Sequence, residues 1–205
     1  MLTLAIDSAT EACSAALFED GELLEGSYET IGRGHVERLV PMISALPGKG
    51  RADRVVVSLG PGSFTGVRIG LAAARALGLA WGADVSGYPT LALIAAMAQQ
   101  QRPGPVTVCT TGGHGEWFVQ NFDGSGRPED ELVSLTPEKA ALFARHPSVA
   151  GNQSEALVEL RGDGDARPLL PDARSLLLLP TALFTSTLAP LYGRPPDARL
   201  PQSTT

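Results

Sequence analysis

The first part of the chain combines short stretches of strand-like pattern with a longer stretch of helical pattern. Residues 2–8, 12–19 and 22–29 are rich in apolar residues and separated by turn residues, which predicts three short strands. From His35 the apolar residues recur at helical spacing, which predicts a helix that ends at Pro47. The chain is therefore expected to begin as a β-meander followed by a helix.

A second run of strands and helices follows. The continuous apolar run Val55-Val56-Val57-Ser58-Leu59 is typical of a strand that is buried on both faces of a sheet. Residues 64–81 are then predicted to form a helix, residues 84–86 a short strand and residues 90–97 another helix. The order βββαβαβα predicts a right-handed α/β unit.

The pattern starts again, in weaker form, after Pro103-Gly104-Pro105, which is the best linker in the sequence. Adding 103 to the residue numbers places Leu4-Ala5-Ile6-Asp7 on Thr107-Val108-Cys109-Thr110. The same shift places Asp20-Gly21 on Asp123-Gly124. The match is thin, but its parts keep their order along the chain.

We therefore predict two domains, an N-terminal lobe over residues 1–102 and a smaller, degenerate lobe over residues 103–205. The second lobe is expected to include a strand at residues 149–153 and a helix in the region of residues 176–184. Duplicated βββαβα lobes packed together form the actin-like (ASKHA, ribonuclease H-like) α/β fold of actin, sugar kinases and Hsp70.

Composition and charge limit the classes of partner. The chain of 205 residues has a formal net charge of −6 and a pI of about 5.1, so it has no electrostatic reason to hold a polyanion such as tRNA unaided. No run approaches about 20 uninterrupted apolar residues, and the N-terminus lacks a basic leader. A cytoplasmic protein without membrane partners is expected. Cys13 and Cys109 are too few for a disulfide framework or a thiolate metal site.

The segment SLGPGSFTGVRIG, residues 58–70, places four glycines between a buried strand and a helix. Such a junction can bind an anion, because free backbone N–H groups and the helix dipole meet there. The segment lacks the Gly-Lys-Ser/Thr ending of a P-loop, and its third glycine falls one residue too late for the dinucleotide-binding spacing. Nucleotide binding by this glycine loop stays open as an alternative, without a motif to support it.

The helix after the glycine loop carries a stripe of small residues. Gly66, Gly70 and Ala74 lie four residues apart, and Ala73 and Leu77 lie beside them. A face with so little side-chain bulk lets another helix approach closely. The stripe therefore predicts either a helix–helix seam with a partner or close packing on the protein's own sheet.

Basic and metal-ligating side chains define no site in the sequence. Arg68 and Arg75 lie on another side of the same helix, as solvated charges or as partners for acidic groups across an interface. The histidines His35, His114 and His146 do not share the spacing that places two metal ligands on one helix face. We therefore expect no metal site.

Four segments carry a resemblance to a known family. They are Ile6–Thr10, the helix start Gly34–Pro41, the glycine loop Ser58–Gly70 and the segment Pro190–Ala198. Together they resemble the bacterial TsaB (YeaZ) family, an accessory subunit in the synthesis of N6-threonylcarbamoyladenosine at position 37 of tRNAs. The glycine-loop motif is highly specific, the other motifs are supporting, and the resemblance covers nearly the whole chain.

The resemblance implies an actin-like, two-lobed fold without independent catalysis. Members of the family pair with the transferase TsaD, which they activate, and with the ATPase TsaE, and they meet tRNA only through the complex. Two helices of the first lobe, here residues 35–46 and 64–81, form a helical bundle with TsaD, or a homodimer in its absence. The implied interface residues here are Val36, Leu39, Val40, Ile43, Gly66, Gly70, Ala73, Ala74 and Leu77.

The sequence also departs from the family pattern in two places. Relatives carry Asp-Ala-Arg ahead of Gly-Glu-Val-Tyr, where this chain has Thr111-Gly112-Gly113-His114-Gly115-Glu116-Trp117-Phe118. Gly193 replaces the leucine of a Tyr-Leu-Arg motif near the C-terminus. The first change removes a charge pair, so any salt bridge that relatives form there is in doubt.

The residues needed for ATP-dependent catalysis are incomplete. ATP-using actin-like proteins need a carboxylate in each lobe to organise Mg²⁺, each on a turn where glycine lets the backbone approach the phosphates. Asp7 is in place, but Ala9 stands where glycine is expected, and the second half offers Thr110 or Thr111. We expect Asp7 and Thr10 to be a vestigial phosphate turn, with no catalytic residue and no cofactor. The alternative is a stand-alone ATP-dependent phosphotransferase or hydrolase of the same superfamily.

Overall fold

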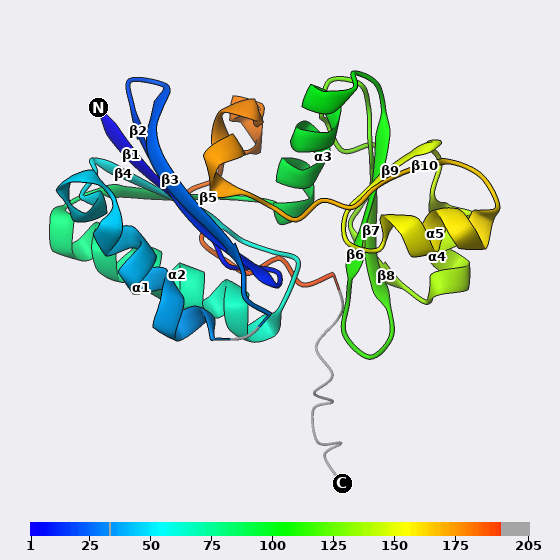
Figure 1. Ribbon diagram of the computed structural model, residues 1–205, viewed down its shortest axis with the longest axis horizontal. Helices are drawn as coiled ribbons and strands as arrows, with labels where there is room; N and C mark the ends of the chain where they lie inside the picture. The colour runs from blue at the N-terminus through cyan, green and yellow to red at the C-terminus, as the bar shows by residue number, and fades with distance from the viewer. Residues whose placement is uncertain (33, 194–205) are drawn as a thin grey trace, which may run out of the picture.

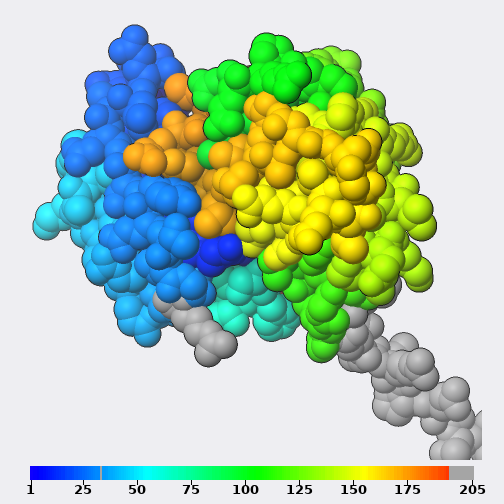
Figure 2. Space-filling model, turned by 45° about the vertical axis from the view of Figure 1, so that its right-hand side comes forward, coloured from blue at the N-terminus to red at the C-terminus, as the bar shows by residue number. Residues whose placement is uncertain are grey.

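Two five-stranded mixed sheets with outer helices, and one helix between them, make up the protein (Figure 1). The structure is a computed structural model in which residues 1–32 and 34–193 are described. The sheets belong to two lobes that are in contact, with the later part of the chain, orange in Figure 2, lying between them.

The first sheet has the strand order β3-β2-β1-β4-β5. Its strands are β1 (Leu2–Asp7), β2 (Ala12–Glu19), β3 (Glu22–Thr30), β4 (Arg54–Ser58) and β5 (Asp84–Tyr88). The first three strands pair antiparallel, and β4 and β5 continue the sheet in parallel. Helices α1 (His35–Ala45) and α2 (Phe64–Trp81) cover the same outer face. Leu46 is the C-cap residue of α1 and lies just before the short 3-10 turn η1 (Pro47–Gly50).

The second sheet repeats this topology with the order β8-β7-β6-β9-β10. Its strands are β6 (Val106–Thr111), β7 (Trp117–Phe122), β8 (Val133–Leu135), β9 (Ser148–Ala150) and β10 (Asp165–Arg167). Helices α4 (Pro137–Phe143) and α5 (Ser154–Arg161) cover its outer face. The repeated strand order confirms the prediction of duplicated actin-like α/β lobes.

Helix α3 (Thr90–Gln101) lies between the two sheets. Nearly every residue from Thr90 to Ala98 is buried, because one side of the helix packs on each lobe. The largest hydrophobic cluster joins Phe18 and Val56 of the first sheet to α3 and to Val108 and Phe122 of the second. The two lobes therefore share one core.

The C-terminal part of the described chain, residues 173–193, returns to the first lobe and corrects two predictions. It forms the 3-10 turns η2 (Ala173–Leu178) and η3 (Thr181–Leu183) in place of one helix over residues 176–184, because Pro180 interrupts the helical hydrogen bonds. The turn η2 packs on β1, β2 and β3, and Thr185 pairs with Gly87 of β5.

The predicted boundary at residue 103 therefore separates the two sheets but not this return segment. Residues 194–205 of the predicted second lobe lie outside the described residues, as does the end of the Pro190–Ala198 motif.

Candidate functional site

A cleft of 760 Å³ lies between the two lobes. The β1–β2 turn and the glycine loop before α2 form its first-lobe wall. The β6–β7 hairpin and the loop before α5 form its second-lobe wall, and the return segment contributes residues 190–193. The cleft therefore lies where the sequence predicted a vestigial phosphate turn.

Asp7, the carboxylate of that turn, is completely buried at the end of β1. Its Oδ1 accepts a hydrogen bond from the Ala9 N–H at 3.0 Å, and its Oδ2 accepts one from the Tyr88 hydroxyl at 2.9 Å. Burial raises the pKa of Asp7 to about 6, and these hydrogen bonds oppose the shift only in part. Both oxygens are engaged within the protein, so Asp7 acts as a turn residue. Thr10 has a similar local role, because its Oγ1 accepts from the N–H of Ala12 at 3.2 Å.

The second lobe has no carboxylate at the matching position. Thr110 lies near the end of β6, as Asp7 does in β1, and its hydroxyl is buried without a hydrogen-bond partner among the described residues. A neutral hydroxyl does not supply the charge that a magnesium–nucleotide complex requires. The residues present do not fit a metal-bound nucleotide in the manner of ATP-using actin-like proteins.

The glycine loop lies directly on the β1–β2 turn. A Cβ atom at Gly62 would collide with the carbonyl group of Ala9, and one at Gly66 would collide with the carbonyl oxygen of Ser8. The Ser63 N–H donates to the Ala9 carbonyl at 2.6 Å, so the loop is bonded to the turn as well as packed on it. These glycines are therefore explained by close approach within the chain, rather than by a bound phosphate.

The same packing corrects the expected partner seam at three residues. Gly66, Gly70 and Ala74 are buried on the side of α2 that faces its own sheet. A Cβ atom at Gly70 would lie 2.7 Å from the Ser8 Oγ atom and 3.4 Å from a methyl carbon of Val57. Small residues are needed here because the helix lies close to β1 and β4, so they are not available to a partner.

The expected interface residues of α1 divide into two faces. Leu39 and Ile43 are buried in the core between α1 and the sheet, which corrects their assignment to a partner surface. Val36 and Val40 are each 59% exposed on the outward side. Apolar side chains that are exposed one helical turn apart form a surface that a partner can cover.

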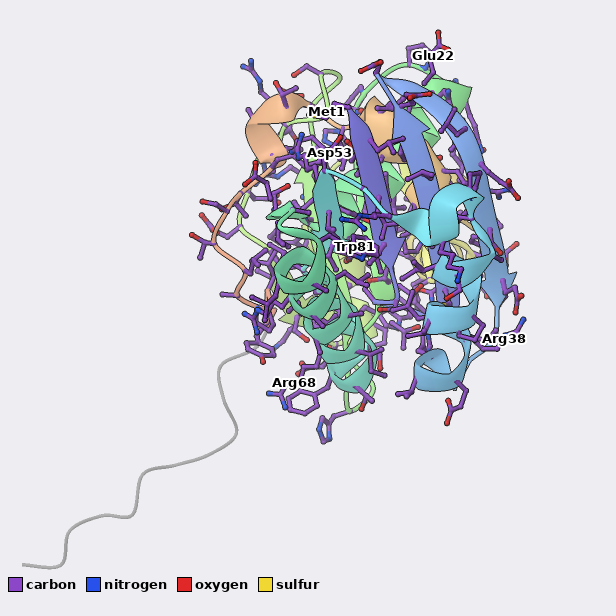
Figure 3. All side chains as sticks on the ribbon, turned by 90° about the vertical axis from the view of Figure 1, so that its left-hand side faces the viewer. Met1, Glu22, Arg38, Asp53, Arg68 and Trp81 are labelled. Carbon is purple, nitrogen blue, oxygen red and sulfur yellow. The ribbon has the colours of Figure 1, made fainter. Side chains whose placement is uncertain are left out.

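The outward side of α2 carries a second row of small residues. Ala72, Ala76 and Ala80 are exposed and lie four residues apart. Ala73 and Leu77, which the sequence placed in the interface, are partly buried beside this row. Figure 3 looks onto α1 and α2, which lie side by side over the sheet. Sequence reasoning missed the alanine row, although its spacing was visible.

The two arginines of α2 hold the return segment. The Arg68 guanidinium lies 3.4 Å from the centre of the Phe64 ring and donates to the Tyr192 hydroxyl at 3.1 Å. Arg75 donates to the Leu188 carbonyl at 2.6 Å. In the described chain these arginines therefore anchor residues 188–192 against α2.

The structure gives a reason for glycine at position 193, where the family pattern has leucine: the Phe118 ring lies directly beside it. A Cβ atom at Gly193 would lie 2.6 Å from a ring carbon of Phe118 and 3.4 Å from Leu132. A leucine at this position would need the Phe118 ring to move. Glycine lets the return segment pass the second lobe closely at the edge of the cleft.

The histidines lie apart and have separate surroundings. The Nε2 atom of His35 is 2.8 Å from the Thr10 carbonyl oxygen, and that of His146 is 2.6 Å from the Glu129 carboxylate. His114 lies in the β6–β7 hairpin with a φ of 58°. Residues 1–32 and 34–193 contain no group of three His, Cys, Asp or Glu side chains placed to hold a metal ion. Within this part of the chain, no helix has the length and apolar character to cross a membrane.

Known sequences with similarity to this chain come from several bacteria. The family model described as "TsaD: tRNA N6-adenosine threonylcarbamoyltransferase" matches residues 29–165. The tRNA threonylcarbamoyladenosine biosynthesis protein TsaB of Escherichia coli is 41% identical over 100 residues, which cover 46% of this chain and 43% of that protein. The match thus spans less than half the length of that relative. An uncharacterized protein of Mycobacterium tuberculosis is 33% identical over 96% of this chain and 93% of its own length.

Solved structures extend the similarity to the whole fold. An uncharacterized protein with similarity to peptidase YEAZ from Pseudomonas aeruginosa has a TM-score of 0.79 at 28% identity, covering 94% of this chain and 99% of that chain. YeaZ from Pseudomonas aeruginosa has a TM-score of 0.72 at 30% identity, covering 87% of this chain and 89% of that chain.

Two lobes of one repeated topology, joined by a shared central helix and separated on one side by a cleft, define an actin-like two-lobed protein. The relatives with the same fold and related sequence are named TsaB and YeaZ. The chain belongs to the TsaB (YeaZ) family.

Proposed function

We propose that this protein is a noncatalytic subunit of the complex that makes N6-threonylcarbamoyladenosine at position 37 of tRNA. In this proposal it binds and activates a TsaD-type transferase through a helical bundle formed by α1 and α2. The observation that carries the proposal is the outward apolar surface of these two helices, centred on Val36 and Val40 and on the alanine row of α2.

The chemistry of this surface suits a helical partner. Alanine side chains lose little conformational entropy on burial, and they allow two helix backbones to approach closely. Val36 and Val40 add β-branched side chains that are already restricted before binding. These properties favour helix–helix packing over the binding of a small polar molecule.

The geometry of the cleft supports the absence of catalysis in this subunit. Asp7 is buried and doubly bonded within its turn, and Thr110 offers no charge from the opposite lobe. The glycine loop packs directly on the carbonyl groups of Ser8 and Ala9 in the turn. The transfer reaction is therefore assigned to the partner.

Further partners follow from the same proposal. A TsaE-type ATPase joins the complex, and tRNA is contacted only indirectly, as the net charge of −6 favours. The outward surface of α1 and α2 is also the face by which two copies would form a homodimer when the transferase is absent. The assembly is placed in the cytoplasm.

A charge on the outward surface tests the interface. We expect Val40→Asp combined with Ala76→Asp to weaken binding to the TsaD-type subunit at least about tenfold, because the partner would bury two unpaired charges. Titration calorimetry with the purified partner measures this change. The matched control is Leu142→Asp, which changes an 89% exposed leucine on α4 of the other lobe and should leave affinity unchanged. Unaltered affinity in the double variant, with the fold intact by circular dichroism, contradicts the proposed interface.

Calorimetry with Mg-ATP on the isolated protein tests the alternative of an ATP-dependent phosphotransferase or hydrolase. We expect no binding in the micromolar range, because Asp7 cannot leave its buried hydrogen bonds without disrupting the turn. Micromolar binding that the Asp7→Ala variant abolishes would support the enzyme in place of the accessory subunit.

A further inference from the structure

A hydrogen bond crosses the cleft between the two lobes. The Nδ2 atom of Asn152, in the loop before α5, donates to Oε1 of Glu11, in the β1–β2 turn, at 2.7 Å. Both residues line the cleft, and both are partly buried. We infer that this bond is a latch that holds the lobes closed and sets the width of the cleft.

The second lobe orients the amide of Asn152 before it meets Glu11. The Thr111 N–H donates to Oδ1 of Asn152 at 2.9 Å, which fixes which side of the amide carries the oxygen. Its Nδ2 atom also donates to Thr111 Oγ1 at 3.0 Å, and Gln153 donates to the same hydroxyl at 2.8 Å. The remaining N–H of Asn152 therefore points at the first lobe.

The first lobe holds the backbone of Glu11 in place. The carbonyl oxygen of Glu11 accepts from the N–H groups of Ile31 at 2.9 Å and Gly32 at 3.0 Å. The backbone of the latch residue is thus tied to the end of β3. Because the acceptor is a carboxylate, the bond to Asn152 is stronger than one between neutral groups.

Other hydrogen bonds between the lobes define a hinge on the far side of the cleft. At the C-terminal end of α3, Gln99 donates to the carbonyl oxygens of Gly104 at 2.9 Å and Asp123 at 2.7 Å. Arg167 donates to the Ala98 carbonyl at 3.2 Å at the same end. The lobes are fixed there and by the shared core, so loss of the latch would let them rotate apart at the cleft.

The latch also connects the second lobe to the start of α1. The Nε2 atom of His35, the first residue of α1, lies 2.8 Å from the Thr10 carbonyl oxygen, one residue before Glu11. A movement of the β1–β2 turn would therefore reach α1 directly. The relevance of this link to a partner rests on the proposed function, but the latch itself does not.

Pulsed electron spin resonance on the isolated full-length chain tests the latch. Spin labels at Glu37→Cys and Glu155→Cys, both exposed in the first turns of α1 and α5, report the distance between the lobes. The native Cys13 and Cys109 are completely buried, and burial raises the pKa of both thiols, so the labels attach to the introduced cysteines. We expect one narrow distance distribution in the otherwise unchanged protein.

Asn152→Asp should shift this distribution to longer distances, because it places two carboxylates against each other. Glu11→Gln should keep the closed distance, because the glutamine carbonyl still accepts from Asn152. Gln153→Ala is the matched control, since it removes a bond to the same threonine without touching Glu11.

An unchanged distribution in Asn152→Asp would overturn the latch, and so would equal opening in Gln153→Ala. Should Asn152→Asp fail to fold, Glu11→Ala makes the same test from the first lobe. No partner is present in this experiment, so its result is separate from the fate of the proposed function.

Discussion

Asp7 shows how a buried carboxyl group can be held by hydrogen bonds within the protein. Its carboxyl group is completely buried at the end of β1, and its oxygens accept hydrogen bonds from the Ala9 N–H and the Tyr88 hydroxyl. The cost of removing the charge from water exceeds what these bonds return, and this is why its pKa is raised to about 6. The negative charge of the nearby Asp172 carboxylate also raises the pKa of Asp7.

The raised pKa predicts a pH dependence of stability. The folded state holds the Asp7 proton more tightly than the unfolded state, so this contribution is complete below about pH 4 and is lost as the pH rises through about 6. The two pKa values, 3.8 and about 6, correspond to a loss on the order of 3 kcal/mol.

Urea unfolding of the protein and of Asp7→Asn between pH 4 and 7.5 measures this difference. The variant should lack the loss, since asparagine cannot ionise. Parallel pH profiles of the two proteins would show that the carboxyl group titrates normally in the folded state.

At the scale of the element, α2 carries two rows of small residues with opposite roles. The row Gly66, Gly70 and Ala74 faces the sheet, and the row Ala72, Ala76 and Ala80 faces outward. Both rows have a four-residue spacing, so periodicity alone cannot say which one meets the sheet. The row with the glycines faces the sheet, because glycine permits a contact with the β1–β2 turn that a methyl group would block.

A methyl group at Gly66 should therefore destabilise the protein. Glycine to alanine inside a helix normally stabilises by up to about 1 kcal/mol, but here the new Cβ meets the Ser8 carbonyl oxygen. We expect Gly66→Ala to lower the free energy of unfolding by about 1–3 kcal/mol, measured by urea denaturation. Gly113→Ala, in open space, is the control and should change it by less than about 0.5 kcal/mol. A Gly66→Ala variant as stable as the parent would show that α2 can shift away from the turn.

At the scale of the whole molecule, the sequence predicts the individual strands and helices but not the contacts between residues that are far apart in the chain. Strand and helix patterns depend on neighbours in the chain, so α2 was predicted at residues 64–81, as observed, and the repeated lobe was recognised. The return segment could not be predicted, because its contacts with β2 and with Gly87 join residues far apart in sequence. The same holds for the site: Val36 and Val40 are exposed while Leu39 and Ile43 are not, and only the sheet beneath them determines which is which.

The central position of α3 has a consequence for how the chain can be divided. Both lobes pack on the same hydrophobic helix, and this helix belongs in sequence to the first lobe alone. Cleavage of the chain at Pro103 would expose, in the second fragment, the hydrophobic surface where Val108 and Phe122 now contact α3. Although the two lobes repeat one topology, we expect neither to fold alone, because each buries its hydrophobic surface against the same helix.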